Sequence, residues 1–282
     1  MNLFEAILLG IIQGITEFLP ISSTGHLTIA GNLMSLISNE NPERWTSFIA
    51  VIQLGTLAAI LIYFYKDILH ILIEFFRDNL VSRKPFKSQS ENSKLGWLIL
   101  IGTIPIVILG FSFKEIIEGA LTKNLYVIAV SLIVLAVILA AAEKLGRFKK
   151  NMEEITVFDS IMIGIAQSVS LIPGSSRSGT TITGGLFMGL KRETAARFSF
   201  LLSIPAIFGS GLLQLNESLE YIDPQLAINL IVSTLFSAIS GYLAIDFLLK
   251  YLKKHSTFLF VYYRIGLGIL IIILISFNII NS

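Results

Sequence analysis

The chain has 282 residues, of which 54% are hydrophobic and 14% charged, and its mean hydropathy is +0.78. This composition excludes a soluble globular domain, whose core could not use so much apolar surface, and predicts an integral membrane protein. The absence of cysteine excludes disulfides and thiolate metal sites, and the three histidines lack zinc-type spacing. The net charge of +2 is uninformative as a total, and no nucleic-acid partner is expected.

The chain begins with two short apolar segments. Residues 3–19 are predicted to form a helix that Pro20 ends, and residues 21–38 follow with Ser22-Ser23-Thr24-Gly25 near their start. Each segment is short for a full crossing, which takes about 20 residues. We therefore expect a broken, re-entrant hairpin, which also suits Gln13 because polar groups at depth need cover by protein or a wet cavity.

A polar loop at residues 39–46 leads to the first full span, and an amphipathic helix and a disordered linker are predicted within residues 66–94. A second broken hairpin is expected at residues 157–190. Short loops are expected at residues 114–124 and 216–225. The six spans are predicted at residues 47–65, 95–113, 125–142, 198–215, 226–249 and 258–280, with Pro105 and Pro205 inside two of them.

Lysine and arginine gather in four segments, which hold sixteen of the 21 cations: residues 66–94, 143–156, 191–197 and 250–255. The loops between the other span ends hold only Arg44, Lys114 and Lys123. By the positive-inside rule, the four basic segments are cytoplasmic. The predicted fold is thus an all-α membrane protein of six transmembrane helices and two re-entrant hairpins, with both termini outside.

The two hairpins repeat each other in sequence. At one constant offset, three residues of the first hairpin match three of the second: Phe4, Gly10 and Gln13 with Phe158, Gly164 and Gln167. After one deletion, three more match: Pro20, Ser22 and Ser23 with Pro173, Ser175 and Ser176. The topology makes the repeats inverted, approximately residues 1–142 and 155–282 of a single membrane domain. Broken helices that meet near the midplane build sites for anionic ligands, so a composite site is expected.

Arg177 anchors the second half of that site. Its insertion near the bilayer centre costs at least about 2.5–3.5 kcal/mol, and it stays protonated, so it needs a partner. Pro173-Gly174 ends one apolar run and leaves backbone N–H groups free at the start of the next helix, as in phosphate sites. The guanidinium fork matches two phosphate oxygens. Neighbouring hydroxyls add donors, namely those of Ser175, Ser176, Ser178 and Thr181.

The first hairpin supplies candidates for the chemistry. Glu17 is an intramembrane carboxylate that could act as a general base or bind a divalent cation such as Mg²⁺ or Ca²⁺. His26, beyond the break, can face the same cavity and suits proton transfer or nucleophilic attack. Ser23, supported by Ser22, is the other candidate nucleophile, and an activated water is the third.

Three further polar residues complete the prediction. Gln13 is expected to support the site by hydrogen bonding, and Gln53 either lines the cavity or joins helices. Arg264, inside the last span, is expected to have a structural role and to pair with Asp246 or with lipid.

With these residues in view, the chain resembles the undecaprenyl-diphosphate phosphatase family, the bacitracin-resistance type of integral membrane enzyme. The resemblance covers essentially the whole chain and rests on three stretches: Gln13-x-x-x-Glu17 followed by Phe-Leu-Pro-Ile-Ser-Ser-Thr-Gly-His, Ile52-Gln53-Leu54-Gly55, and Pro173-Gly174-Ser175-Ser176-Arg177-Ser178-Gly179-Thr180-Thr181. The family pattern allows glutamate or glutamine at the first position. Gln13 leaves one carboxylate, which argues against a metal site built from two.

The resemblance implies removal of the terminal phosphate from a lipid substrate, undecaprenyl diphosphate, at the outer face of a bacterial plasma membrane. The product would return to cell-wall synthesis. A polyprenyl-phosphate transporter or flippase is the alternative, because inverted repeats suit it equally and fold does not decide function. A phosphatidic-acid-type phosphatase is rejected, since after Arg177 the sequence has only His255 as a histidine. The oligomeric state is left open, a homodimer included.

Overall fold

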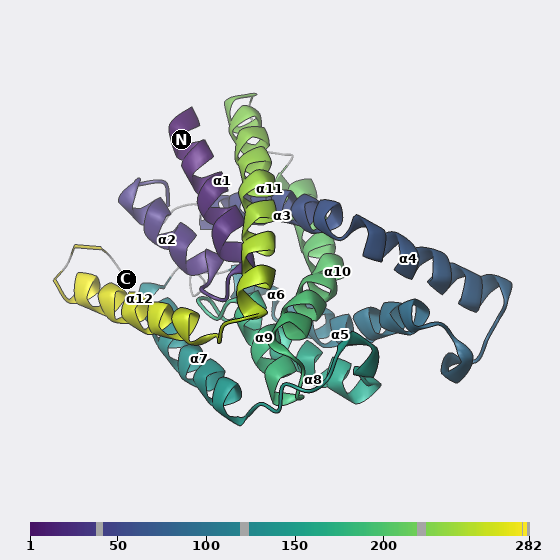
Figure 1. Cartoon of the computed structure of the whole chain (residues 1–282). Coiled ribbons are helices and arrows are strands. Elements are labelled where there is room, and N and C mark those ends of the chain that lie inside the picture. The colour runs from purple at the N-terminus through teal and green to yellow at the C-terminus, as the bar shows by residue number, and fades with distance from the viewer. Residues whose placement is uncertain (38–41, 119–123, 219–223, 278, 281–282) are drawn as a thin grey trace.

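The computed structural model describes residues 1–37, 42–118, 124–218, 224–277 and 279–280, and in these ranges the chain is helical without a β-strand (Figure 1). Six of the described helices are long and apolar enough to cross a membrane: α3 (Pro42–Tyr63), α5 (Glu91–Ser112), α7 (Leu125–Leu145), α10 (Arg192–Ser218), α11 (Pro224–Leu252) and α12 (Phe258–Ser276). The predicted all-α membrane protein with six spans is confirmed.

Two broken helices accompany the spans. The first consists of α1 (Leu3–Phe18) and α2 (Ser23–Leu33), and the second of α8 (Val157–Ser168), the 3₁₀ turn η5 (Val169–Leu171) and α9 (Arg177–Phe187). The 16 residues of α1 rise about 24 Å, which is less than the hydrocarbon thickness of about 30 Å. We call residues 17–26 the first tip and residues 172–181 the second tip. Their entry from opposite faces stays a prediction.

The two tips have the same local backbone. Ser22 and Ser176 cap α2 and α9 with φ of 76° and 68°, and each Oγ accepts the backbone N–H three residues on, at 3.2 Å. The constant offset upstream therefore continues through the breaks, and the deletion assumed from the sequence is wrong. Ser22 is equivalent to Ser176, and Ser23 to Arg177.

The helix pairs follow a two-fold pattern. α1 packs on α11 as α8 packs on α5, while α3 pairs with α10 and α7 with α12. Close approach needs glycine in both copies: a Cβ on Gly10 would lie 2.4 Å from the carbonyl oxygen of Ser233, and one on Gly164 would lie 2.2 Å from that of Gly102. Small residues that let backbones approach are the usual means of helix packing in membranes. A duplicated chain would give this pattern.

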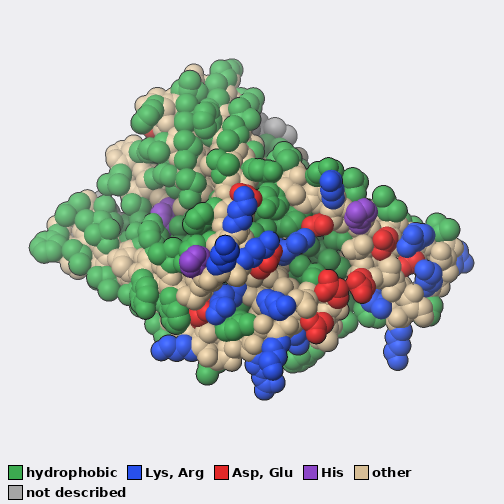
Figure 2. Space-filling model, in the orientation of Figure 1, with side chains coloured by type: hydrophobic (Ala, Val, Ile, Leu, Met, Phe, Trp, Pro, Cys, Tyr) green, Lys and Arg blue, Asp and Glu red, His purple; other side chains and the backbone are tan. Residues whose placement is uncertain are grey.

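The four basic segments lie on one face, which we call the charged face (Figure 2). Ion pairs join them across the chain: Arg197 to Asp67 at 2.7 Å, Lys253 to Glu193 at 3.2 Å, and Arg192 to Glu143. Segments far apart in the sequence are therefore neighbours on one side of the helices, as the predicted topology requires.

Residues 66–94 differ from the prediction, because the disordered linker expected there is wrong. The amphipathic helix is α4 (Tyr65–Phe76), and it runs into a π-helical turn (Arg77–Val81) and a 3₁₀ turn (Phe86–Ser88). Asp78 orders this connection, since its buried carboxylate accepts the backbone N–H of Ser90 at 2.8 Å and the ammonium of Lys84 at 2.9 Å.

The other loop predictions are tested in part. A short helix, α6 (Lys114–Glu118), occupies the start of the expected loop at 114–124, and α3 begins at Pro42 inside the expected loop at 39–46. The expected loop at 216–225 is shorter as well, because α10 reaches Ser218 and α11 begins at Pro224. The remaining residues of these loops lie outside the described ranges.

The contacts of Asp78 predict that the stability of the connection between α4 and α5 depends on pH. The backbone N–H of Ser90 and the ammonium of Lys84 hold the pKa of Asp78 well below its usual range. A depressed folded pKa means that the stabilisation is complete above the unfolded value of about 3.9 and is lost as the pH falls toward the folded pKa. At pH 7, Asp78→Asn should speed amide hydrogen exchange at residues 78–90, and this difference from the parent should shrink below about pH 4. Equal protection at pH 7 would contradict the role.

Candidate active site

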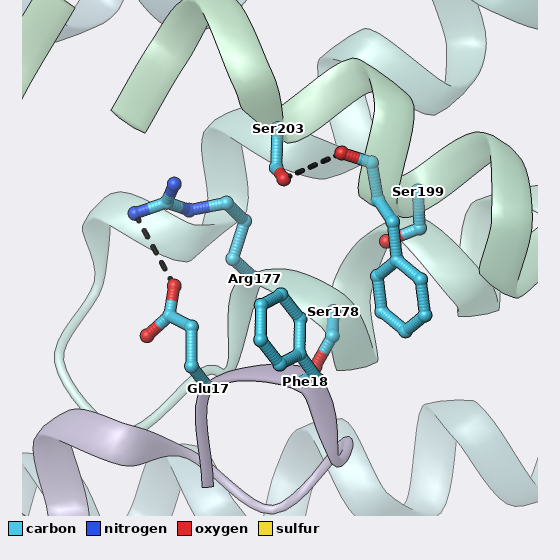
Figure 3. A pocket seen from close by; sticks show the side chains of 7 residues that line it. Glu17, Phe18, Arg177, Ser178, Ser199 and Ser203 are labelled. Carbon is cyan, nitrogen blue, oxygen red and sulfur yellow. Dashed lines mark hydrogen bonds and ion pairs between the residues drawn. The ribbon is translucent and has the colours of Figure 1, made fainter. Parts of the chain in front are cut away.

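The two tips meet in the interior of the molecule. Ser178 Oγ donates to the carbonyl oxygen of Leu19 at 3.0 Å, and an oxygen of Glu17 lies 3.8 Å from a nitrogen of Arg177 (Figure 3). Beside this contact is a small, partly open cleft, lined by Glu17, Phe18, Arg177, Ser178, Ser199, Phe200 and Ser203. The structure thus brings together the acid of one repeat and the cation of the other.

Glu17 is held by its own hairpin. Its Oε2 accepts hydrogen bonds from Gln13 Nε2 at 3.0 Å and from Ser23 Oγ at 2.7 Å, and its side chain is 5% exposed. Gln13 lies one helical turn before Glu17 on the same face of α1. Ser23 begins α2 on the other side of the break at Pro20. The carboxylate is therefore positioned to take the hydroxyl proton of Ser23.

Arg177, the first residue of α9, is poorly satisfied. Its Nη2 lies 3.5 Å from Gln53 Oε1 and 3.8 Å from Glu17 Oε1, and its Nη1 is buried without a partner among the described residues. Charged hydrogen bonds of this type normally measure about 2.7–2.9 Å. A guanidinium carries five N–H donors in a fork that matches phosphate. The geometry leaves donors for an anion between Arg177 and the first tip.

The charges around the tips favour an anionic ligand. Arg177 stands at the N-terminus of α9, where the helix dipole adds partial positive charge. Arg264 lies beside the same turn, because a Cβ on Gly179 would be 2.7 Å from its Nη1. The residues that line the cleft include one carboxylate, that of Glu17. Positive charge thus exceeds negative charge here.

His26, predicted to be able to face the cavity, is not among the residues that line the cleft, and neither is Ser23. Its Nδ1 lies 2.7 Å from the carbonyl oxygen of Ser22, so Nδ1 carries the proton, and its Nε2 lies 2.6 Å from the hydroxyl of Tyr263. The two rings are stacked, with centroids 5.6 Å apart. Among the described residues, no hydrogen bond joins His26 to Glu17 or Ser23, because both ring nitrogens are bonded elsewhere.

Most of the other predicted hydroxyls bond to the backbone of their own tip, as short hydroxyl side chains commonly do. Ser22 and Ser176 cap their helices, Ser175 Oγ donates to the carbonyl oxygen of Ile172 at 2.6 Å, and Thr181 donates to that of Arg177 at 2.7 Å. Of the predicted hydroxyls in the second tip, Ser178 lines the cleft.

The sequence did not indicate the part of the cleft that α10 contributes. Ser199 and Ser203 lie one helical turn apart, and Ser203 Oγ donates to the carbonyl oxygen of Phe200 at 2.7 Å. Phe200 packs edge to face against Phe18, with ring centroids 5.2 Å apart, and the pair forms an apolar wall. The signal was weak, because serines spaced by four are common in packed membrane helices.

The expected pairing of Arg264 with Asp246 is wrong. Asp246 accepts from Lys250 at 2.7 Å and from the hydroxyl of Tyr63 at 3.3 Å. The side chain of Arg264 is fully buried, and its Nη2 donates to the carbonyl oxygen of Ser175 at 2.9 Å.

The residues at the site could hold a divalent cation only together with ligands from a bound phosphate. The described residues contain no group of three or more His, Cys, Asp or Glu side chains that could hold a metal. Gln13 Oε1, however, is buried without a partner beside the Glu17 carboxylate. Mg²⁺ is commonly bound by one or two carboxylates together with substrate phosphates. The site therefore fits a cation that shares its ligands with a bound phosphate.

Fold and site together define a class of polytopic membrane proteins. In this class a serine–carboxylate pair and an arginine with unsatisfied hydrogen-bond donors lie where two broken helices meet. A family model described as "Bacitracin resistance protein BacA" matches residues 6–270, and the chain belongs to this family. It is 56% identical to a protein of Syntrophobacter fumaroxidans over 95% of each chain. It is also 53% and 50% identical to proteins of Chlorobium phaeobacteroides and Chloroherpeton thalassium, over 98% of each chain. All three relatives are named undecaprenyl-diphosphatase.

Proposed function

We propose that this protein hydrolyses undecaprenyl diphosphate to undecaprenyl phosphate and inorganic phosphate, which recycles the lipid carrier and confers bacitracin resistance. The observation that carries the proposal is the guanidinium of Arg177, which has an unpartnered buried Nη1 and lies 3.8 Å from the Glu17 carboxylate that accepts the Ser23 hydroxyl. The names of the relatives specify the lipid.

The proposed reaction has two displacements. Arg177 binds oxygens of the terminal phosphate, and Ser23 Oγ attacks its phosphorus while Glu17 Oε2 takes the hydroxyl proton, across the present distance of 2.7 Å. The bond from this phosphorus to the bridging oxygen breaks, and undecaprenyl phosphate leaves. Glu17 passes this proton to the bridging oxygen of the departing product and is again a carboxylate. Water then attacks the phosphoserine, and Glu17 accepts a proton from the water. It gives this proton to Ser23 Oγ as the bond from phosphorus to Ser23 breaks, so inorganic phosphate and free Ser23 result. Arg177 stabilises charge on the transferred group in both steps.

Ser23 is preferred as the nucleophile to His26 and to water. Support comes from the direct hydrogen bond of Ser23 to Glu17, whereas the unprotonated nitrogen of His26 already accepts from Tyr263. In this proposal His26 keeps a supporting role. Gln53 helps to orient Arg177, and Gln13 helps to orient Glu17.

A divalent cation, Mg²⁺ or Ca²⁺, is proposed as the cofactor, held by Glu17 and Gln13 Oε1 together with substrate oxygens. When bound, it would supply neutralisation of phosphate charge. The chain's own groups still provide the attacking oxygen, the proton acceptor and the arginine.

The protein is proposed to lie in the bacterial plasma membrane, with the charged face in the cytoplasm and the active site open to the outer side. The gathering of the four basic segments on one face supports this orientation, by the positive-inside rule. The basic side chains would then contact anionic lipids of the inner leaflet.

The proposed function is tested by phosphate release from purified protein in lipid vesicles that contain undecaprenyl diphosphate and Mg²⁺. The parent chain should release phosphate, and Ser23→Ala should release at least about a hundredfold less, because it lacks the attacking oxygen. Thr24→Ala is the matched control and should stay close to the parent. A transporter would move the lipid between leaflets without phosphate release, and full activity of Ser23→Ala would refute the nucleophile.

A further inference from the structure

Helix α12 contacts both tips through two neighbouring residues. Tyr263 reaches the first tip, where its hydroxyl meets His26 Nε2 at 2.6 Å, three residues after Ser23. Because His26 Nδ1 is protonated toward the Ser22 carbonyl, Nε2 is the acceptor and the tyrosine O–H is the donor. The hydrogen bond and the ring stack together fix the first turn of α2, which carries Ser23.

Arg264 reaches the second tip. Its Nη2 donates to the carbonyl oxygen of Ser175, two residues before Arg177, and its Nη1 lies against Gly179, two residues after Arg177. The side chain is fully buried, and no carboxylate pairs with it among the described residues. Burying a cation without a counter-ion costs free energy, and an apolar side chain would fill the same space without this cost. Packing alone therefore does not account for an arginine here.

We propose that Tyr263 and Arg264 are positioning residues, which hold Ser23 and Arg177 at the separation that phosphate transfer needs. Consecutive residues on a helix point about 100° apart, so one rigid helix can hold two elements that approach it from different directions. The proposal rests on the proposed phosphatase function and adds to it the element that aligns the two halves of the site.

The partner of α12 supports the same alignment. Helix α7 packs along α12, and its Ile128 contacts both tips: the carbonyl oxygen lies 2.5 Å from where a Cβ on Gly174 would be, and Cγ2 lies 3.3 Å from the corresponding position on Gly25. The pair α7 and α12 thus forms a common support for both tips. Errors of about 1 Å between reacting groups can lower the rate a hundredfold, so a support that fixes both tips can raise the rate of phosphate transfer.

The test compares Tyr263→Phe with Tyr262→Phe in the vesicle assay with undecaprenyl diphosphate. Both changes remove one hydroxyl from adjacent positions of α12, but Tyr262 is 70% exposed and packs on Phe258. Tyr263→Phe should lower kcat by roughly tenfold, the value of one lost hydrogen bond, with KM within about twofold of the parent. Tyr262→Phe should match the parent in both constants. The thermal unfolding temperature of Tyr263→Phe should lie no more than a few degrees below that of Tyr262→Phe, because one hydrogen bond is lost.

A double-mutant cycle tests whether Tyr263 acts through His26. If it does, adding Tyr263→Phe to His26→Ala should lower kcat no further, and additive losses would overturn that route.

For the second tip, Arg264→Lys keeps a donor for the Ser175 carbonyl and should retain more kcat than Arg264→Gln, whose shorter side chain does not reach it. Equal kcat in these two variants would overturn the role of Arg264.

The outcomes separate the two proposals. If the parent and Tyr262→Phe release no phosphate, the proposed function fails. If they release it and Tyr263→Phe releases it with the same kcat, the positioning role of Tyr263 fails. A lowered unfolding temperature with unchanged kcat and KM in the folded fraction would mark Tyr263 as structural only, which also overturns the proposal.

Discussion

Arg177→Ala should lower kcat/KM for phosphate release from undecaprenyl diphosphate by about a thousandfold or more, while the protein still folds. In the proposed mechanism the arginine supplies the donors that meet charge on the transferred phosphoryl group, and losses of this size are typical when such a residue is removed. Folding should persist because the guanidinium has no close partner: its contacts measure 3.5 and 3.8 Å, and Nη1 has none among the described residues. Kinetics and thermal unfolding of the purified variant provide the measurements.

Arg177→Lys distinguishes charge from geometry. A lysine keeps the cation but cannot offer two parallel N–H donors to a phosphate, so this variant should also be severely impaired. Arg83→Ala serves as the control, because Arg83 is an exposed arginine on the charged face, and it should retain parental activity. Parental turnover in Arg177→Ala would remove Arg177 from the mechanism, and parental turnover in Arg177→Lys would mean that charge alone suffices.

Glu17→Gln should reduce kcat by about a hundredfold to ten-thousandfold, with a much smaller change in KM. The amide has nearly the same shape as the carboxylate but cannot accept the Ser23 proton, so the loss should fall on the chemical step. If a cation shares this carboxylate, the variant should in addition need a higher Mg²⁺ concentration for half-maximal rate. Steady-state kinetics at varied lipid and Mg²⁺ concentrations measure both effects.

Glu5→Gln is the matched control for that change. Glu5 lies on the same helix and completes its N-terminal capping box, in which glutamine can replace glutamate. Its activity should equal that of the parent. If Glu17→Gln instead kept the parental rate and Mg²⁺ dependence, Glu17 would be neither base nor cation ligand.

The fold followed from the sequence because membrane insertion imposes simple constraints. Apolar run length located the spans, and prolines located the breaks, although several helices extend further than the hydropathy indicated, as α10 does at both ends. The linker at 66–94 was misjudged, since its polar composition resembles that of a disordered segment. One buried aspartate, Asp78, orders it through contacts that composition does not reveal.

The sequence predicted that Glu17 and Arg177 lie together, but it did not predict the contacts that distant helices make around them. Glu17 and Arg177 stood out because charged groups inside apolar runs are rare, and the repeat indicated that they meet. The wall from α10 and the hydrogen bond between Tyr263 and His26 depend on how distant helices pack, which local patterns do not encode. The repeat register was misread at the breaks because identical serines stand next to each other in both copies, and only the cap geometry distinguishes Ser22 from Ser23.

That shared cap geometry cannot by itself set which way round a bound diphosphate lies. A diphosphate is nearly symmetric about its bridging oxygen, and the two capped turns have nearly the same backbone conformation. A direction can come only from equivalent positions where the copies differ in side chain, such as Ser23 and Arg177, Glu17 and Leu171, or His26 and Thr180.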